Sequence, residues 1–484
     1  MIPPGRTQPT PDDVVVQGLT ADSRTVRPGY LFAALPGSHA DGRRFIAAAI
    51  EHGAGVVLAP TGTELPAEAR GVVLVTDAEP RRLLAKLAAR FYGAQPRTVA
   101  AVTGTSGKTS SVDFLRQIWT RLGRRAASIG TLGVIRPGRP TMSSLTTPDP
   151  VLLHETLADL ALDGVDHLAI EASSHGLDQY RLDGLVAAAA GFTNLGRDHL
   201  DYHPSREAYL AAKRGLFERV LEPKGKAVIN ADAPESAEIA AICRRRGIGV
   251  VGYGASETAD LRLTGRRAET GAQILSLMVS GSSREVRLPL VGAFQAMNAL
   301  QALGLAIATG AEPAAAADAL AFIEGVPGRL QLAGRRGNGA EIYVDYAHKP
   351  DALEAVLTTL RPHVQGRLWV VFGCGGDRDA GKRPIMGGLA AKLADRVVVT
   401  DDNPRSENPA AIRRQVMAGS PAAREIGDRA EAIHYAVAAL GPGDVLVVAG
   451  KGHEQGQIIG SQVRPFDDAA VVQAALGGLE GVAA

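Results

Sequence analysis

Short apolar runs alternate along this chain with longer segments whose apolar residues recur at helical spacing. Residues 99–102, 168–170 and 187–192 are continuous apolar runs, as in strands that are buried on both faces. Residues 112–122, by contrast, place apolar side chains three or four positions apart, which is typical of a helix. This alternation predicts an α/β protein in which helices connect the strands of a doubly wound, mostly parallel sheet.

The alternation falls into three segments, and we predict one domain for each. Residues 1–96 combine short apolar runs with two helical segments, which indicates a small α/β domain that ends near Pro96. Residues 97–327 hold the doubly wound sheet, and residues 328–484 repeat the alternation as a Rossmann-like α/β domain. A chain of 484 residues is too long for one ordinary core, which agrees with about three domains.

A glycine-rich loop connects the apolar run at 99–102 to the helical segment that follows. Its sequence is Thr103-Gly104-Thr105-Ser106-Gly107-Lys108-Thr109-Ser110. In such loops glycines let backbone N–H groups close around phosphate oxygens, and the helix N-terminus adds partial positive charge. Lys108 is suited to reach the terminal phosphates, and Thr109 is suited to ligate Mg²⁺. Val102 stands where the common pattern has its first glycine, and the alternative is a turn that binds nothing.

Composition limits the possible partners. The formal net charge is +1, from 52 basic and 51 acidic residues, so no overall field attracts nucleic acid or an anionic membrane. Cys243 and Cys374 have no CxxC spacing, which argues against a disulfide framework or a thiolate metal site. The opening residues MIPPGRTQPTPDD do not resemble a secretory signal, and no apolar run nears the roughly 18 residues of a membrane span. We therefore expect a cytoplasmic protein.

Two further strand ends in the second segment deliver residue types that ligate metals. Glu171 follows the run at 168–170, and His199 lies shortly after the run at 187–192. Ligands bind outside the carboxyl ends of parallel strands, so both side chains are expected beside the phosphate loop. A hard cation such as Mg²⁺ prefers oxygen ligands and tolerates few nitrogens. The alternative is that Glu171 caps the next turn and His199 is a hydrogen-bonded core residue.

Two polar residues in predicted helices also leave two interpretations open. Lys213 lies beside the apolar stripe of the helix at 207–220, where the ordinary interpretation is a surface lysine with a buried stem. The functional alternative is a lysine that burial deprotonates and that CO₂ converts into a carbamate, which adds a carboxylate ligand. Asn298 lies in an alanine-rich helix, where asparagine is more often solvated or capping than in contact with a base.

Four polar clusters of the third segment each follow an apolar run. Because strand ends of a parallel sheet meet at one edge, these clusters predict a single cleft. The clusters are residues 345–350, 373–379, 401–405 and 450–454.

Six stretches of the chain, in this order, resemble motifs of the Mur ligase family. They are GTSGKTS at Gly104, EASSHGL at Glu171, NLGRDHLDYH at Asn194, GRLQ at Gly328, DYAHKPDAL at Asp345 and the GKGHE stretch ending at Glu454. The resemblance extends from Asp22 to about Asp468. It implies ATP-dependent formation of an amide bond, assisted by Mg²⁺, in the synthesis of the peptidoglycan stem peptide.

Three more stretches resemble the members of this family that add meso-2,6-diaminopimelate to UDP-N-acetylmuramoyl-L-alanyl-D-glutamate. They are TTP at Thr146, SSHGLDQYR ending at Arg181, and DNPR at Asp402. The chain departs from the family at Leu145 and Lys349, and neither departure removes a required charge. The resemblance implies small-molecule substrates, neither nucleic acid nor membrane as a partner, and a monomer.

The resemblance also implies a role for particular residues. It assigns ATP binding to Gly104, Thr105, Ser106, Gly107, Lys108, Thr109, Ser110, Asn298, Arg329 and Asp345. It assigns the UDP-muramoyl dipeptide to Ser23, Ser38, His39, Ala40, Thr146, Thr147, Ser173, Gln179 and Arg181. It assigns diaminopimelate to Arg378, Asp402, Asn403, Pro404, Arg405, Gly450 and Glu454. The implied metal ligands are Thr109, Glu171, His199 and Lys213 as a carbamate, and the implied catalytic residues are Lys108, Lys213, Glu171 and His199.

Arg405 carries the choice of amino acid. Diaminopimelate differs from lysine by a second carboxylate, and a guanidinium binds a carboxylate through two parallel hydrogen bonds. Lysine would leave Arg405 desolvated and unpaired, at a cost of about 1–3 kcal/mol or more. In the family, lysine-adding members lack an arginine at this position, so its presence here favours diaminopimelate. Arg378 is expected to bind the other carboxylate, and Glu454 an ammonium group.

Three other functions remain possible from the sequence. A sister ligase, such as a lysine-adding enzyme or a folylpolyglutamate synthetase, would share the ATP loop but take another acceptor. A P-loop NTPase that drives movement would release phosphate without an acceptor amine and would leave the cluster at Asp402 without a role. A non-catalytic nucleotide-binding scaffold would not need all four of the residues that the chain retains, namely Lys108, Thr109, Glu171 and His199.

Overall fold

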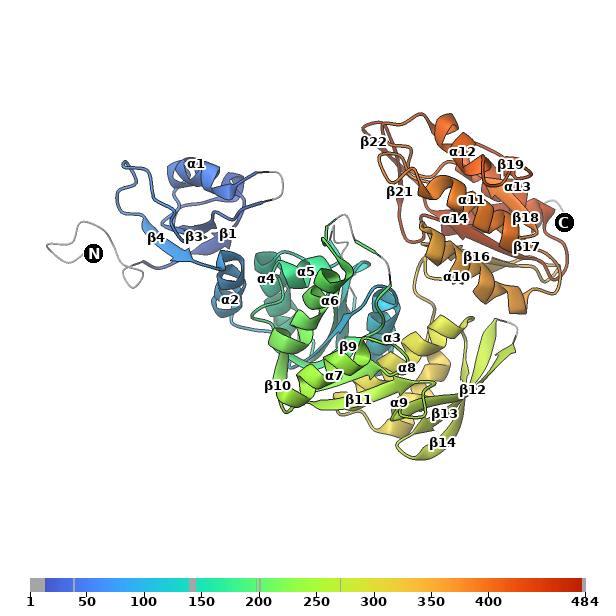
Figure 1. Ribbon diagram of the computed structural model, residues 1–484, viewed down its shortest axis with the longest axis horizontal. Helices are drawn as coiled ribbons and strands as arrows, with labels where there is room; N and C mark the ends of the chain where they lie inside the picture. The colour runs from blue at the N-terminus through green and yellow to red at the C-terminus, as the bar shows by residue number, and fades with distance from the viewer. Residues whose placement is uncertain are drawn as a thin grey trace. The chain divides into compact units, whose positions relative to one another are not determined.

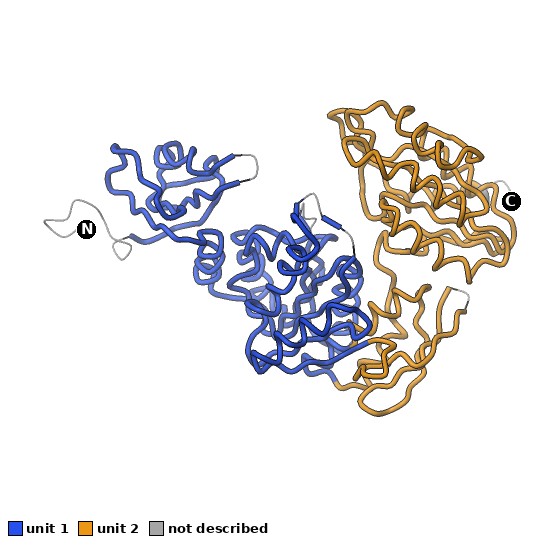
Figure 2. Tube along the Cα trace, in the orientation of Figure 1, with its two compact units in different colours: residues 1–253, 304–311 blue, residues 254–303, 312–484 orange. Residues whose placement is uncertain are grey.

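The computed structural model describes residues 14–37, 40–138, 145–196, 198–199, 202–269 and 271–480. The chain divides into two compact units (Figure 2). Unit 1 comprises residues 1–253 and 304–311, and unit 2 comprises residues 254–303 and 312–484.

The first part of unit 1 is a small parallel sheet, drawn in blue in Figure 1. Its strands pair in the order β1 (Gly18–Thr20), β2 (Tyr30–Ala33), β3 (Val56–Pro60) and β4 (Val73–Asp77). Successive side chains of a strand point to opposite faces, so each face of the sheet packs against its own helix. Phe32 packs on the side of α1 (Ile46–Glu51), and Leu31 packs on the side of α2 (Pro80–Tyr92).

The second part of unit 1 is a sheet in the order β11-β10-β9-β5-β8-β6-β7, parallel except at β7. Its strands are β5 (Thr98–Thr103), β6 (Ala126–Gly130), β7 (Gly133–Ile135), β8 (His167–Glu171), β9 (Ala187–Phe192), β10 (Leu221–Asn230) and β11 (Gly249–Gly254). Its helices are α3 (Lys108–Arg121), α4 (Pro150–Leu162), α5 (Ser174–Asp178), α6 (Arg206–Gly215), a π-helix (Leu216–Val220) and α7 (Ser236–Arg245). The predicted doubly wound sheet is confirmed.

This strand order determines where the loops meet. β5 lies between β9 and β8, so the segments that follow these three strands leave the sheet at one edge. They carry the glycine-rich loop, the residues after Phe192 and the residues after Glu171.

Unit 2 begins with an antiparallel meander that the sequence analysis did not anticipate. Its strands are β12 (Leu261–Glu269), β13 (Ala272–Val279) and β14 (Ser282–Leu288). Leu275, Leu277 and Val279 are buried in alternation on β13, which is the pattern of a strand with one buried face. The helices α8 (Ala293–Ala308) and α9 (Pro313–Ala319) and a short 3₁₀ turn (Leu320–Phe322) follow.

The rest of unit 2 is a sheet in the order β15-β16-β20-β17-β18-β19, parallel except at β15. Its strands are β15 (Gln331–Arg335), β16 (Glu341–Asp345), β17 (Leu368–Phe372), β18 (Arg396–Val399), β19 (Arg424–Glu425) and β20 (Val445–Ala449). The helices are α10 (Pro350–Leu360), α11 (Lys382–Leu393), α12 (Pro409–Met417), α13 (Arg429–Ala439) and α14 (Asp468–Glu480), and β21 (Gly456–Ile459) and β22 (Gln462–Pro465) form a hairpin.

Both faces of this sheet are covered, as the continuous apolar strands predict. On β20, Val445 and Val447 pack with residues of α10, α11 and α12, whereas Leu446 and Val448 pack with residues of α13 and α14. The four strands predicted in this segment are confirmed, and the polar clusters lie at the carboxyl ends of β16, β17, β18 and β20. No helix of the described residues is long and apolar enough to cross a membrane.

Candidate active site

The glycine-rich loop between β5 and α3 packs directly against the segment that follows β9. Gly104 has a φ of 147°, and a Cβ atom there would lie 1.7 Å from the Thr193 hydroxyl, so only glycine permits this approach. The Ser106 N–H donates to Asn194 Oδ1 at 3.1 Å, and the Thr193 hydroxyl donates to the Ser106 carbonyl at 2.7 Å. These contacts hold the loop at the N-terminus of α3, where partial positive charge favours a phosphate.

Two lysine side chains end at the same backbone oxygen of this loop. Lys108, the first residue of α3, donates to the carbonyls of Gly104 and Thr105, both at 2.9 Å. Lys213, from α6, donates to the Gly104 carbonyl at 2.8 Å and is only 1% exposed. Burial, assisted by the positive charge of Lys108, holds the pKa of the Lys213 ammonium well below its ordinary value. The interpretation of Lys213 as a surface lysine is therefore wrong.

Tyr209 connects α6 to the loop. The Lys213 ammonium lies 4.1 Å from the centroid of the Tyr209 ring, in a cation–π contact. The Tyr209 hydroxyl lies 3.1 Å from the hydroxyl of Thr105, which in turn accepts the N–H of Gly196 at 2.9 Å. Burial raises the pKa of Tyr209 to about 12, so the phenol stays protonated at neutral pH. The contact with Thr105 thus holds the Tyr209 ring against the buried Lys213 ammonium.

Glu171, at the end of β8, is almost completely buried. Its Oε1 accepts the backbone N–H of Thr131 at 2.7 Å, and its Oε2 accepts the Thr131 hydroxyl at 3.3 Å. The next helix, α5, is capped instead by Ser173, whose hydroxyl accepts the N–H of Gly176. Glu171 therefore does not cap the turn that follows it, and that alternative is wrong.

His199 lies on the segment after β9 in a left-handed backbone conformation, with a φ of 54°. Its N–H donates to Asp198 Oδ1 at 2.7 Å, and its Nε2 lies 3.5 Å from Asp198 Oδ2. Its ring meets the ring of His175 edge to face, with centroids 4.8 Å apart. The side chain is 41% exposed, so His199 is not the core residue of the alternative interpretation.

The predicted dipeptide-binding residues of unit 1 form one hydrogen-bonded group beside Glu171. The Thr147 hydroxyl donates to the Glu171 carbonyl at 2.9 Å and accepts the Ser173 N–H at 3.1 Å. Arg181 donates to the Thr147 carbonyl at 2.7 Å and to Gln179 Oε1 at 2.8 Å. Thr146 joins this group because its hydroxyl lies 3.1 Å from that of Thr131.

The predicted nucleotide-binding residues of the first sheet follow adjacent strands. Ser23 opens a 3₁₀ turn (Ser23–Thr25) after β1, and Ala40 precedes a second 3₁₀ turn (Gly42–Phe45) after β2. β1 and β2 are parallel neighbours, so both segments leave the same edge of the sheet. Ser38 and His39 lie outside the described residues.

Asp345 ends β16 in unit 2 and is deeply buried. Its Oδ2 accepts the N–H of Leu330 at 2.7 Å, and its Oδ1 accepts the N–H of Ala347 at 2.8 Å. Burial raises the pKa of this carboxyl to about 6, although the charge of Arg329 acts in the opposite direction. The Arg329 guanidinium lies over the ring of Tyr346, 4.7 Å from its centroid.

Asn298 on α8 is connected to Arg329 through one glutamine. Its Nδ2 donates to Gln295 Oε1 at 3.1 Å, and Gln295 Nε2 donates to the Arg329 carbonyl at 3.0 Å. Asn298, Arg329 and Asp345 thus belong to one network in unit 2, whereas the glycine-rich loop belongs to unit 1.

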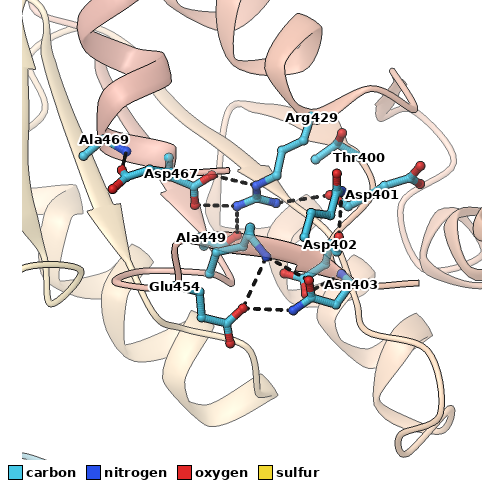
Figure 3. A network of polar contacts seen from close by, with 12 residues as sticks. Thr400, Asp401, Asp402, Asn403, Arg429, Ala449, Glu454, Asp467 and Ala469 are labelled. Atoms are coloured by element: carbon cyan, nitrogen blue, oxygen red, sulfur yellow. Dashed lines mark hydrogen bonds and ion pairs between the residues drawn. The ribbon is translucent and has the colours of Figure 1, made fainter. Parts of the chain in front are cut away.

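Asn403, on the segment after β18, lies at the centre of a polar network in unit 2 (Figure 3). Its Oδ1 accepts the Ile458 N–H at 2.9 Å and the Lys451 ammonium at 2.9 Å. Its Nδ2 donates to Glu454 Oε2 at 2.9 Å, and Lys451 donates to the same oxygen at 3.2 Å. Asn403 and Glu454, which are far apart in sequence, are therefore brought into direct contact.

Arg405 is held by backbone bonds to the β21–β22 hairpin. Its N–H donates to the Ile458 carbonyl at 3.0 Å, and its carbonyl accepts the Gly460 N–H at 2.8 Å. Its backbone is left-handed, with a φ of 51°. The guanidinium donates to the Gly376 carbonyl at 2.8 Å, which directs it toward the loop after β17.

The other residues predicted to bind the amino acid surround this network. Gly450 has a φ of 118°, and a Cβ there would lie 2.7 Å from Asp402 Oδ2. Asp402 Oδ2 is buried and has no hydrogen-bond partner among the described residues, so it could accept a hydrogen bond from a ligand. Pro404 is buried within the loop, whereas Arg378 is exposed and donates only to a backbone carbonyl, at 3.3 Å.

Among the described residues, no group of three or more His, Cys, Asp or Glu side chains could hold a metal ion. The predicted metal ligands include types outside that set, namely the Thr109 hydroxyl and a carbamate on Lys213. Glu171 offers the carboxylate oxygens that Mg²⁺ prefers, and the buried Lys213 amine suits a carbamate, so the donor types fit the ion. This ligand set stays a prediction.

Comparison with known protein families covers most of the chain. The family model described as "Mur ligase family, catalytic domain" matches residues 15–92, and the "Mur ligase middle domain" matches residues 102–306. The "Mur ligase, glutamate ligase domain" matches residues 328–452. This chain belongs to the Mur ligase family. The three Mur ligase domains and the mixed α/β sheets agree with the predicted fold class.

Curated Mur ligases are similar over nearly the whole chain. A UDP-N-acetylmuramoyl-L-alanyl-D-glutamate--2,6-diaminopimelate ligase from Rhizobium meliloti (strain 1021) is 55% identical over 468 residues, which cover 96% of this chain and 95% of that protein. A protein of the same name from Caulobacter vibrioides (strain ATCC 19089 / CIP 103742 / CB 15) is 52% identical over 479 residues, 98% of each chain.

Solved Mur ligase structures share the fold. A structure of UDP-N-acetylmuramoyl-L-alanyl-D-glutamate--2,6-diaminopimelate ligase is 35% identical, with a TM-score of 0.73, and the match covers 96% of this chain and 95% of that chain. A MurF ligase from Thermotoga maritima in complex with ADP is 20% identical, with a TM-score of 0.63 and coverage of 97% and 99%. At that identity the second likeness concerns the fold alone.

Several residues of this Mur ligase site were not predicted from the sequence. Tyr209, Thr131 and Lys451 each hold a predicted site residue in place. Lys451 lies within the GKGHE motif, so its place in the site could be expected from the resemblance, but its burial could not. Thr131 and Tyr209 lie outside every motif that was recognised, so only the fold reveals them.

Proposed function

We propose that this chain is the ATP-dependent ligase that joins meso-2,6-diaminopimelate to the D-Glu carboxyl group of UDP-N-acetylmuramoyl-L-alanyl-D-glutamate. Relatives that are 52–55% identical over almost the full length carry this name. The choice of amino acid rests on the group of side chains around Asn403. The Asn403 amide contacts the Glu454 carboxylate, and the Arg405 guanidinium lies on the same loop as Asn403.

The reaction begins with transfer of the γ-phosphoryl group of ATP to the side-chain carboxylate of D-Glu. A carboxylate is a poor acyl donor because its leaving group would be oxide, whereas an acyl phosphate releases phosphate. Both reactants of this first step are anions, so their repulsion must be neutralised. Mg²⁺, when bound, supplies part of that neutralisation.

The chain's own residues position the phosphates. The Gly104–Ser110 loop presents backbone N–H groups at the start of α3, and Lys108 supplies a mobile positive charge. When a phosphate arrives, the Lys108 ammonium can exchange its two backbone carbonyl partners for phosphate oxygens, which are stronger acceptors. Thr146, Thr147, Ser173, Gln179 and Arg181 hold the muramoyl dipeptide so that its carboxylate faces the loop.

The second step joins the amino acid. The amine of diaminopimelate attacks the acyl carbon, the new C–N bond forms, the C–O bond to phosphate breaks, and a proton leaves the nitrogen. Asp402 Oδ2 is a buried acceptor without a partner and is suited to an ammonium group of the amino acid. Arg405 binds the carboxylate that distinguishes diaminopimelate from lysine.

The domain boundaries, the localisation and the oligomeric state of the chain are proposed as well. Domain boundaries are proposed at residues 96 and 327, near the gaps between the matched family models. The protein is proposed to be cytoplasmic, because ATP is available there, and it is proposed to be a monomer. Light scattering of the purified protein tests the monomer, and a mass near 100 kDa instead of 50.4 kDa would contradict it.

One experiment tests the function. Purified protein is incubated with ATP, Mg²⁺ and UDP-N-acetylmuramoyl-L-alanyl-D-glutamate, and phosphate release is measured with diaminopimelate, with lysine and with neither. We expect release with diaminopimelate only, together with a product whose mass has increased by one diaminopimelate residue. Release that ignores the amino acid would indicate an NTPase, and release with lysine would indicate a sister ligase.

A further inference from the structure

Lys451 is a buried charged residue that the reaction described above does not use. It follows β20 in the GKGHE stretch, and its side chain is 0% exposed. A lysine is almost never completely buried unless its ammonium is paired. Because Lys451 is buried, its charge does not serve solubility or surface charge, and it must have another role in the protein.

The Lys451 ammonium closes a triangle with two residues proposed to bind the amino acid. It donates to Asn403 Oδ1 at 2.9 Å and to Glu454 Oε2 at 3.2 Å. Asn403 Nδ2 donates to the same Glu454 oxygen at 2.9 Å (Figure 3). Asn403 Oδ1 therefore has two donors, because the Ile458 N–H also reaches it at 2.9 Å. The three residues of this triangle come from two segments of unit 2, the one after β18 and the one after β20.

This triangle determines which atoms can face a ligand. Asn403 Oδ1 is occupied twice, so the second N–H of its Nδ2 is the donor that the amide can still offer. Glu454 Oε2 is likewise occupied twice, so Oε1 is the oxygen that can accept a new bond. The Glu454 side chain is 34% exposed and would be mobile without these two donors.

The triangle also balances charge. Glu454 and Asp402 would place two carboxylates beside the incoming amino acid, and Asp402 Oδ2 has no partner of its own. The Lys451 ammonium offsets one of these negative charges within the protein, in a place that water does not reach. The incoming carboxylates then meet a site whose negative charge is already reduced.

We propose that Lys451 is a positioning residue for the incoming amino acid, which it serves by fixing the Asn403 amide and the Glu454 carboxylate in their binding orientations. This inference rests on the proposed amino-acid-binding role of Asn403 and Glu454. Lys451 itself is covered by its two partners and is not expected to touch the amino acid.

The test is a steady-state comparison of Lys451→Met with the wild type, with each of the three substrates varied in turn. We expect the KM for diaminopimelate to rise about 10- to 100-fold, the range associated with loss of a charge-assisted hydrogen bond. The KM values for ATP and for the UDP-muramoyl dipeptide should stay within about twofold, because neither is proposed to contact the triangle. A uniform loss of activity with unchanged KM values would overturn the inference and indicate a merely structural role.

Two further variants guard against misfolding and unrelated charge effects. Lys451→Gln keeps an NH2 group that can still donate to Asn403 and Glu454 but lacks the positive charge, so it should give an intermediate KM. Lys392→Met removes an exposed lysine of α11 in the same unit and should leave every KM unchanged. An unaltered KM for diaminopimelate in folded Lys451→Gln and Lys451→Met would contradict the inference.

A double-mutant comparison separates this inference from the proposal on which it rests. Because Lys451 acts through Asn403 as well as Glu454, Asn403→Ala with Lys451→Met should raise the KM by clearly less than the product of the two single changes. Multiplied effects would overturn the inference. If Asn403→Ala and Glu454→Gln leave the KM for diaminopimelate unchanged, the amino-acid-binding assignment itself fails, and the role of Lys451 fails with it. Product formation by the wild type tests the ligase function independently.

Discussion

The ammonium groups of Lys108 and Lys213 donate to one and the same oxygen, the carbonyl of Gly104, at 2.9 and 2.8 Å. Two positive charges that converge on one acceptor repel each other, and the buried one is the easier to deprotonate. The pKa of Lys213 is lowered well below its ordinary value for this reason and, above all, because of burial. An amine without its proton is a nucleophile, which supports the proposed reaction of Lys213 with CO₂.

Activity should therefore depend on dissolved CO₂. We expect phosphate release to fall at least about tenfold after CO₂ is removed by degassing at pH 8 and to recover when bicarbonate is added, since a lost metal ligand costs about 1.4 kcal/mol or more. The variant Lys213→Met should be weakly active and insensitive to bicarbonate, while exposed Lys392→Met serves as the control. Full activity of the wild type without CO₂ would contradict the carbamate.

Removal of the Arg405 guanidinium should affect one substrate alone. We expect Arg405→Ala to raise the KM for diaminopimelate about 10- to 150-fold, which corresponds to about 1.5–3 kcal/mol for hydrogen bonds to a charged group. The KM for ATP should not change. Arg464→Ala, an exposed arginine on β22, is the matched control. Equal changes in the KM of every substrate would show that the loop, and not the guanidinium, had been damaged.

Asp183 should stabilise unit 1 through two arginines. Its carboxylate is 3% exposed and accepts from Arg82 of α2 at 3.0 Å and from Arg219 of the π-helix at 3.2 Å. Asp183→Asn removes the negative charge that pairs with both arginines, and we expect a loss of about 2 kcal/mol in the free energy of unfolding, a moderate value because Arg82 is partly solvated. Urea unfolding measures this loss. The control Glu155→Gln, at an exposed position of α4, should change the free energy of unfolding by less than about 0.5 kcal/mol.

Acid should destabilise unit 1 through His154. This histidine of α4 is 3% exposed, its Nε2 has no hydrogen-bond partner, and burial lowers its pKa to about 4. The unfolded chain binds a proton near pH 6.5 and the folded chain does not, so stability is complete above pH 6.5 and falls as pH decreases toward 4.

The variant His154→Leu should lose part of this dependence on pH. Between pH 7 and pH 4, this residue should lower the free energy of unfolding of the wild type by up to about 3 kcal/mol. The variant lacks this contribution, so its free energy of unfolding should fall less over the same range. Urea unfolding midpoints at several pH values give the measurement. Exposed His434→Leu should follow the wild type, and an identical pH profile for His154→Leu would contradict the assignment.

Local patterns were sufficient for the parallel sheets. The strands β5, β9, β17 and β20 are buried on both faces, so their sequences are continuous apolar runs that few other structures produce. The meander β12–β14 was not predicted because one of its faces is polar, and its alternation resembles that of many exposed segments. Its pairing depends on tertiary contacts that the sequence does not display.

The residues of the candidate site also divide into those that local sequence patterns predict and those that depend on tertiary contacts. Glu171 and Asn403 could be predicted because Glu171 ends β8 and Asn403 lies in the polar cluster that follows β18, at the edge where parallel sheets bind ligands. The burial of Lys213 could not be predicted, because the same helical pattern is typical of a surface lysine. The packing of α6 against the glycine-rich loop is what buries the side chain. Lys451 was missed because nothing local indicates that its partners lie 48 residues upstream and 3 residues downstream.

The loop that carries Arg405 is held to the β21–β22 hairpin by main-chain bonds at Ile458 and Gly460, and not by its side chain. A replacement at this position therefore leaves these main-chain bonds in place, and under the proposed role of Arg405 it would change what the site binds. The φ of 51° adds one condition, since asparagine and glycine adopt it more readily than other residues do. If Arg405 selects the amino acid as proposed, single substitutions here could change acceptor preference, and glycine and asparagine are the replacements that the backbone tolerates best.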